Sequence, residues 1–166
     1  MTVEVRRVVA TDGPLLRELR LEALADTPLG YLETLEQARA LDDAAWTARA
    51  VRGSVEGESH QVLALAGGGP IGTTVAFQDG AAAWLAAVYV TPSARGSGLL
   101  ARLLEPCVRW ARDRGAPELR LEVHEDNLRA IVAYARLGFV LTGERRPYPL
   151  GPDRDELTMA LMLGEP

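Results

Sequence analysis

The chain has 166 residues, of which 48% are hydrophobic and 25% are charged; this composition is typical of a globular protein and predicts a single domain over residues 1–166. The net charge of −5 argues against a protein that wraps nucleic acid or an anionic membrane, because either partner requires a net basic surface. All 18 basic residues are arginine, which excludes mechanisms that need a lysine, such as a Walker A phosphate site or a pyridoxal Schiff base.

The N-terminal segment and the cysteine content predict the compartment. Residues 1–12 are charged and lack the apolar run of a signal peptide, and no apolar run in the chain approaches the ~18 residues of a membrane span. The single cysteine, Cys107, excludes an intramolecular disulfide and lies on the apolar face of a predicted helix. The two histidines, His60 and His124, are far apart in the sequence. We therefore expect a cytoplasmic protein without a metal site, in which Cys107 is an unreactive core residue.

The first half of the chain begins with a strand and two helices and continues as hairpins. The first helix is predicted to begin at Asp12-Gly13-Pro14, with the Asp12 carboxylate as its N-cap. Residues 31–41 are compatible with a helix or a loop. The strands joined by glycine turns predict an antiparallel meander. In chain order the predicted elements are a strand over 2–9, helices over 12–26 and 42–52, and strands over 61–66, 71–78 and 81–90.

The second half alternates helices with strands and contains one parallel crossover. The predicted elements are a helix over 98–114, a strand over 119–123, a helix over 127–137, and strands over 139–142 and 156–163. The strand over 81–90, the helix over 98–114 and the strand over 119–123 are predicted to form this crossover, a parallel βαβ unit. The sequence therefore predicts an α/β (α+β) fold: a mixed, mostly antiparallel seven-stranded sheet with about four helices and one parallel βαβ crossover.

The strand that ends at Val90 turns through two glycines, Gly96 and Gly98, into an amphipathic helix. Glycines allow a ligand to approach the backbone closely, and the free amides and positive end of a helix bind anions, so this turn can hold a pyrophosphate without lysine. A tight turn without a ligand is the alternative. The spacing up to Ala101 also fits a dinucleotide-binding fingerprint, with Glu118 near the acidic position, but that fingerprint belongs in a parallel βαβ fold and here follows a meander.

Two blocks resemble the GCN5-related N-acetyltransferase (GNAT) family. Arg95, Gly96 and Gly98 match the family's motif A, in which Leu100 stands where a glycine or alanine is usual. The block from Leu121 to Phe139 resembles the family's motif B. In this block the sequence is similar to that of the ribosomal-protein alanine N-acetyltransferases. The residues that match motif B are Asn127, Ala130, Tyr134, Gly138 and Phe139. The resemblance covers nearly the whole chain and implies a GNAT-like sheet with helices on both faces.

The resemblance implies that acetyl-CoA is the cosubstrate and assigns residues to it. The pantetheine arm would lie along the strand at Val88 and Val90, with Asn127 on the pantetheine side and Tyr134 facing the sulfur. The pyrophosphate would be bound by the amides of the turn, which are those of Arg95, Gly96, Ser97, Gly98, Leu99 and Leu100.

The chemistry of amine acetylation requires an acid and a base. Tyr134 is the candidate acid, since a phenol of pKa about 10 stays protonated near neutral pH and can donate a hydrogen bond to the leaving thiolate; packing in the core is its alternative role. Glu122 is the candidate base, and the resemblance gives it the same role, although it can equally belong to a solvated strand face. His124 lies two residues further on the same face and is the reserve candidate.

The acceptor is predicted only as a primary amine of a small molecule or of a peptide N-terminus, acetylated by direct transfer. Candidate acceptor residues are Tyr31, Glu33, Glu36, Trp84, His124 and Tyr148. Residues 1–94 carry 7 arginines and 12 acids, which favours a cationic amine. A homodimer is compatible with the resemblance. The alternative functions are a catalytically silent acetyl-CoA-binding regulatory module and, less favoured, a dinucleotide-binding enzyme.

Overall fold

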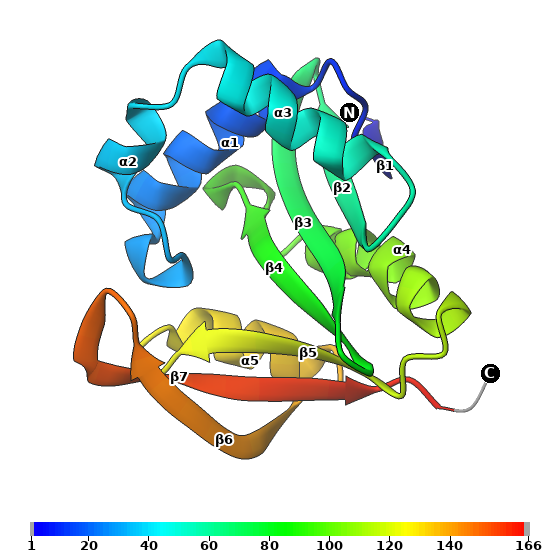
Figure 1. Cartoon of the computed structure of the whole chain (residues 1–166), viewed down its shortest axis with the longest axis vertical. Helices are drawn as coiled ribbons and strands as arrows, with labels where there is room; N and C mark the ends of the chain where they lie inside the picture. Colours follow the sequence, from blue (N-terminus) through cyan, green and yellow to red (C-terminus); the bar gives the residue numbers. More distant parts are fainter. Residues whose placement is uncertain (1, 165–166) are drawn as a thin grey trace.

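A seven-stranded sheet with the order β1-β2-β3-β4-β5-β7-β6 forms the centre of the molecule (Figure 1). The computed structural model describes residues 2–164. All neighbouring strands are antiparallel except β4 and β5, as the sequence predicts. The strands are β1 (Val3–Arg7), β2 (Ser59–Ala66), β3 (Gly69–Asp79), β4 (Ala82–Val90), β5 (Glu118–His124), β6 (Val140–Tyr148) and β7 (Gly151–Met162).

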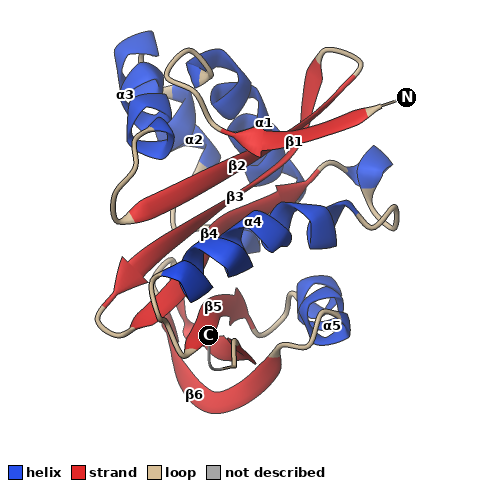
Figure 2. Ribbon diagram, turned by 90° about the vertical axis from the view of Figure 1, so that its right-hand side faces the viewer, coloured by secondary structure: helices blue, strands red, loops and turns tan. Residues whose placement is uncertain are grey.

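Helices cover both faces of this sheet (Figure 2). Within the described residues they are α1 (Gly13–Asp26), α2 (Leu35–Arg39), α3 (Asp43–Ser54), α4 (Leu99–Asp113) and α5 (Leu128–Arg136), with short 3-10 turns η1 (Pro28–Gly30) and η2 (Pro92–Ala94). One core packs α1, α2 and α3 on one face, and the other packs α4 and α5 on the opposite face. The additional helix α2 lies in the segment that the sequence left open, and a Thr34–Gln37 capping box begins it.

The parallel pair β4–β5 is very short, and this positions the site. Only Ala83 with Leu119 and Trp84 with Arg120 are in register, after which the two strands diverge (Figure 1). On the other edge of β4 a register shift at Thr73–Val75 accompanies Ala87, whose φ of 52° lies in the left-handed region. The backbone of β4 beyond Trp84 is therefore not paired with β5 and faces an opening in the sheet.

The C-terminal hairpin corrects the predicted strand boundaries. Strands expected over 139–142 and 156–163 extend to Val140–Tyr148 and Gly151–Met162, so that the intervening segment is almost entirely β-structure. Strand β6 is exposed nearly throughout and lies at the sheet edge, where Pro147 is tolerated. Ion pairs across the hairpin, Arg145–Asp155 at 2.5 Å and Arg146–Glu156 at 2.9 Å, take the place of the apolar alternation that usually marks a strand.

Asp12 occupies the predicted N-cap position of the first helix, but its carboxylate does not cap the helix. Its carboxylate accepts hydrogen bonds from Arg6 Nη1 at 2.7 Å and from the Val9 N–H at 2.8 Å instead. Asp12 is buried, and this pair fixes the end of β1 against the start of α1.

Candidate active site

A cavity of about 1070 Å³ lies where β4 and β5 diverge. Side chains from α1, α3, α5, both strands and the start of α4 line it. Binding sites for small molecules usually measure about 300–1,000 Å³, so this cavity can hold the reactive arm of a large cosubstrate together with a small acceptor.

The turn before α4 lines one wall of this cavity and has features that favour an anion. Gly96 and Gly98 have φ values of 76° and 82°, which favour glycine, and no described atom lies within 4 Å of a Cβ built at either position. The backbone N–H groups from Gly96 to Ala101 have no hydrogen-bond partner among residues 2–164. These amides are oriented at the N-terminus of a 15-residue helix, where its dipole favours negative charge. Ser97 lies beside the cavity rather than on its lining, and its hydroxyl donates to the Ala94 carbonyl at 2.6 Å.

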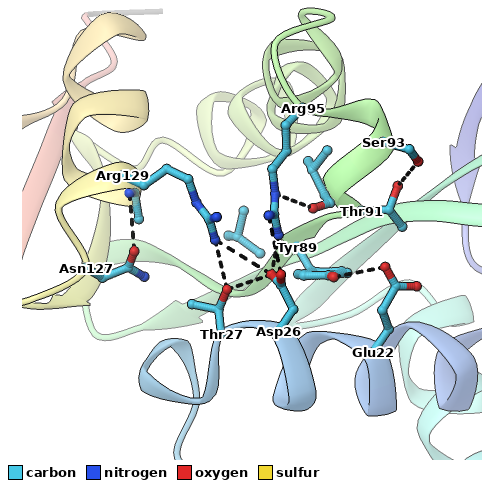
Figure 3. A network of polar contacts seen from close by, with 12 residues as sticks. Glu22, Asp26, Thr27, Tyr89, Thr91, Ser93, Arg95, Asn127 and Arg129 are labelled. Atoms are coloured by element: carbon cyan, nitrogen blue, oxygen red, sulfur yellow. Dashed lines mark hydrogen bonds and ion pairs between the residues drawn. The ribbon is translucent and has the colours of Figure 1, made fainter.

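The guanidinium groups of Arg95 and Arg129 meet at the C-terminal end of α1 (Figure 3). Arg95 pairs with Asp26 and donates from Nε to the Val90 carbonyl at 3.1 Å, while Arg129 donates to Thr27 Oγ1 at 2.9 Å. The hydrogen bond from Arg95 is the main cause of the lowered pKa of Asp26. This cluster joins the glycine turn and α5 to α1 across the cavity and adds positive charge beside the free amides.

The residues assigned to the pantetheine arm lie on the cavity wall. Val88 and Val90 line it from the unpaired part of β4, although the Val88 carbonyl already accepts from Tyr31 Oη at 3.1 Å. Asn127 also lines the cavity, and its Oδ1 caps α5 by accepting from the Ala130 N–H at 3.4 Å. The structure thus gives Asn127 a local role in starting the helix that carries Tyr134.

Tyr134 lies on the cavity lining and is 8% exposed. Its ring packs against Phe139 with centroids 5.8 Å apart, so the packing role considered for it is present as well. No hydrogen bond to its hydroxyl is found within the described part of the chain. Burial raises the pKa of this phenol, which keeps it protonated throughout the neutral range. A buried, protonated hydroxyl without a partner is available to a ligand.

Glu122 faces the cavity from β5 and is held by Arg146, whose Nη2 lies 2.5 Å from Glu122 Oε2. The same guanidinium lies 2.9 Å from Glu156 Oε2 on β7, so Arg146 bridges two carboxylates. Burial raises the pKa of Glu122, Arg146 opposes the shift, and Glu156 reinforces it. A raised pKa makes this carboxylate a better base than a solvated glutamate.

His124 is on the cavity lining but is almost fully buried, whereas Tyr148 is not on the lining. His124 is 3% exposed, and its Nδ1 accepts from the Asp126 N–H at 3.1 Å, which places the proton of the neutral ring on Nε2. In that tautomer Nε2 is a donor and cannot accept a proton from an amine. Tyr148 packs edge-on against His124 at 4.7 Å and donates to the Tyr31 carbonyl at 2.7 Å, outside the cavity lining.

The remaining predicted acceptor residues separate into two groups. Tyr31, Glu33 and Trp84 line the cavity, Trp84 at the point where β4 and β5 are still paired. Glu36 does not: it is exposed in the first turn of α2 and is absent from the lining. The prediction placed it correctly between α1 and α3, but the capping box turns α2 so that only Ala38 is buried.

Sequence reasoning missed a group of cavity residues on α1 and α3. Arg20, Trp46 and Arg49 line the cavity next to Glu33, and we call these four residues the α1–α3 wall. The only signal in the sequence was the predicted helix over 42–52, which contains Trp46 and Arg49. It could not show that guanidinium groups from two separate helices share one carboxylate.

Comparison with known proteins identifies the class of this fold and site. Residues 19–139, more than half of the chain, match the family model for the acetyltransferase (GNAT) family. The chain belongs to the GNAT acetyltransferase family.

Individual relatives agree with this assignment at different levels. Streptothricin acetyltransferase of Streptomyces lavendulae is 43% identical over 56 residues, which is 34% of this chain and only 30% of that protein. The structure of yncA from Salmonella typhimurium, solved with its cofactor acetyl-CoA, superposes with a TM-score of 0.79 at 22% identity over 100% of this chain and 96% of that one. The ribosomal-protein-S18-alanine N-acetyltransferase of Escherichia coli gives 0.69 at 21% identity, covering 99% and 96%. Because both identities are below 25%, these two structures show that the fold is shared and no more than that.

Two further findings concern residues 2–164. No helix in this range is long and apolar enough to cross a membrane. No group of His, Cys, Asp or Glu in the same range is arranged to hold a metal ion. Cys107 is fully buried, and burial raises the pKa of its thiol to about 12, so the thiolate is not accessible for covalent chemistry.

Proposed function

We propose that this protein transfers the acetyl group of acetyl-CoA to a primary amine by direct attack in a ternary complex. One observation carries the proposal: a single cavity brings the free amides of the glycine turn together with a buried phenol and a carboxylate of raised pKa. The amides from Gly96 to Ala101 suit a pyrophosphate, and the diverging strands leave β4 backbone free for an extended arm. When bound, acetyl-CoA would supply an acetyl thioester and leave as a thiol.

Tyr134 is the proposed acid. Its hydroxyl would donate a hydrogen bond to the sulfur as the carbon–sulfur bond breaks, which lowers the cost of the developing thiolate. Because burial raises the pKa of Tyr134, its hydroxyl stays protonated and able to donate throughout the neutral pH range. The buried Cys107 supports direct transfer over a covalent cysteine carrier.

Glu122 is the proposed base. An amine reaches the cavity largely as an ammonium ion and must lose a proton before it attacks. Glu122 and Glu156 together carry two negative charges against one from Arg146, so this end of the cavity favours a cation. The hydrogen bond that His124 accepts at Nδ1 argues against the reserve candidate. The predicted preference for a cationic amine stays a prediction, and it applies to this end of the cavity.

A single domain over 1–166, a cytoplasmic location, the absence of a metal and a homodimer are predictions. For the homodimer, the exposed apolar side chains of Val140 and Leu141 on the edge strand β6 offer a surface, and light scattering coupled to size exclusion measures the state directly.

The test is to incubate the protein with acetyl-CoA and a panel of amines, including polyamines, aminoglycosides, amino acids and N-terminal peptides, while following free thiol. We expect at least one amine to raise thiol release well above the hydrolytic background, and Tyr134→Phe and Glu122→Gln to reduce it. If no amine does so and neither substitution changes the background, the enzymatic proposal is wrong.

Calorimetry with acetyl-CoA separates the alternative. Binding without turnover on any amine would favour the catalytically silent regulatory module, whereas absence of binding would contradict both. The family assignment and the antiparallel meander before the glycine turn argue against a dinucleotide-binding enzyme, which would be stabilised against heat by a nicotinamide cofactor.

A further inference from the structure

The α1–α3 wall of the cavity carries more positive than negative charge. Arg49 and Glu33 form a two-bond pair, with Arg49 Nη2 to Glu33 Oε1 at 2.7 Å and Nη1 to Oε2 at 3.3 Å. Arg20 lies on the other side of the same carboxylate, with its Nε 3.6 Å from Glu33 Oε2. One carboxylate thus faces two guanidinium groups, and the group has a net charge of +1.

Arg20 is the residue with unused hydrogen-bonding capacity. Its side chain is only 22% exposed, yet its guanidinium donates no hydrogen bond to any of residues 2–164, because the contact with Glu33 is too long. It stacks over the Tyr31 ring at 4.8 Å, which fixes the plane of the guanidinium and leaves its edge available. A partly buried cation with few hydrogen bonds is costly unless a ligand satisfies it.

A second donor in the same wall is unsatisfied. Trp46 is 2% exposed and lines the cavity, and its indole Nε1 is buried without a hydrogen-bond partner in the described chain. Arg49 stacks over this indole at 4.6 Å, which joins the two residues into one unit. Arg20, with a side chain that is 22% exposed, is therefore the unused donor that a ligand can reach, whereas Trp46 Nε1 is enclosed and the one carboxylate is already occupied by Arg49.

We propose that the α1–α3 wall binds a carboxylate carried by the acceptor, so that the acceptor is an amino acid whose amine faces Glu122. This inference rests on the proposed function and names its substrate class. A monoanion would neutralise the net charge of +1, and its oxygens would accept from the guanidinium of Arg20. The apolar side chains of Leu16, Leu19 and Phe77, which also line the cavity, favour an amino acid with an apolar side chain.

The two ends of the cavity then complement the two ends of a zwitterion. The Glu122–Arg146–Glu156 group has a net charge of −1 and suits the ammonium, and the Arg20–Arg49–Glu33 group suits the carboxylate. A polyamine satisfies the first group and is repelled by the second. A peptide N-terminus presents a neutral amide where the carboxylate would bind, so the wall discriminates against peptides.

The test uses ligands that need no turnover. Calorimetry on the CoA-bound protein compares N-acetyl-leucine, which keeps the carboxylate, with N-acetyl-leucinamide, which does not. We expect the acid to bind at least about tenfold more tightly, the effect of a lost hydrogen bond to a charged group. Arg20→Gln and, independently, Arg20→Met should remove this preference. The control is Arg17→Gln, which lies on the same helix but forms a surface ion pair with Asp43 at 3.3 Å.

Initial rates of thiol release with leucine and leucinamide are measured alongside. Equal binding of acid and amide, no binding of the acid, or an unchanged preference in both variants would overturn the carboxylate proposal, whatever the rates show. Selective binding of the acid without turnover of any amine would support the carboxylate site and contradict the proposed enzymatic function instead. Loss of the preference in Arg17→Gln would show that any change on α1 has this effect, which also overturns the proposal.

Discussion

Removing Arg146 should move the pH dependence of acetyl transfer in a direction fixed by the structure. Arg146 lies 2.5 Å from Glu122 and 2.9 Å from Glu156, and it opposes the rise in the pKa of Glu122 that burial causes. In Arg146→Gln the two carboxylates face each other without the cation, so the pKa of Glu122 rises further. A neighbouring opposite charge favours the ionised carboxylate, and because the Arg146 side chain is 48% exposed we expect its loss to lower the ionised fraction of Glu122 only about tenfold at a pH below the pKa of Glu122.

A base acts only when deprotonated, so a higher pKa moves the acidic limb of the kcat/KM profile to higher pH. At a pH below the limb the variant should be about tenfold slower than wild type, and the two should converge at a pH above it. The assay is kcat/KM from pH 5 to 9, followed by free thiol. Arg145→Gln is the matched control, because Arg145 neighbours Arg146 on β6 but pairs with Asp155 and Glu125 outside the cavity.

Glu122→Gln should abolish the limb altogether. A limb that stays in place in Arg146→Gln, or that moves to lower pH, would show that Glu122 is not the titrating group. A limb that moves equally in Arg145→Gln would show that net charge alone is responsible.

Three further substitutions test the cavity and the fold. Tyr134→Phe keeps the ring against Phe139, so we expect kcat to fall about 10²-fold with little change in thermal stability; an unchanged kcat would remove Tyr134 from the mechanism. Arg95→Gln should raise the KM for acetyl-CoA about tenfold, and this KM should increase less with salt concentration than that of the wild type. An unchanged KM would exclude Arg95 from the phosphate site. Asp12→Asn should cost about 2–3 kcal/mol of unfolding free energy at pH 7. Burial raises the pKa of Asp12, but hydrogen bonds from Arg6 and from the backbone oppose this and lower the pKa overall. The stability that the ionised Asp12 contributes is therefore lost as the pH falls through the pKa of Asp12 in the folded protein. Thermal unfolding at pH 7 and pH 3 should show a difference from wild type that shrinks in acid; a constant difference would contradict the role of the ion pair.

The parts of the site that the sequence predicts are those fixed by local backbone geometry. Gly96 and Gly98 have the positive φ values that a strand-to-helix turn with free amides requires, and this demand is visible in the residue types themselves. Alternation along β5 likewise predicts that Glu122 lies on the other face of the strand from the buried Leu121 and Val123. In a chain without lysine, these amides and Arg95 are the groups that we propose for the phosphate site.

The parts that the sequence does not predict depend on pairing between distant segments. The polar segment around Arg146 becomes a strand because β7 pairs with it, and no apolar alternation marks it beforehand. His124 alternates correctly onto the face of Glu122, but its burial under Tyr148 requires the hairpin to fold over β5. Periodicity describes one segment at a time and contains no information on such contacts.

Charge counted along the sequence does not describe the charge of the α1–α3 wall, and the reason is pairing. Residues 1–94 carry five more acids than arginines, which predicted a cationic acceptor. In the fold, however, Asp26 pairs with Arg95 from beyond that segment and Glu33 pairs with Arg49, so that Arg20 is left as the side chain without a hydrogen-bonded partner in the wall. Electrostatic selection acts over roughly one Debye length, about 8 Å at physiological salt, and only groups within that distance of the acceptor determine its charge. The acceptor should therefore be sought among molecules that match each end of the cavity separately.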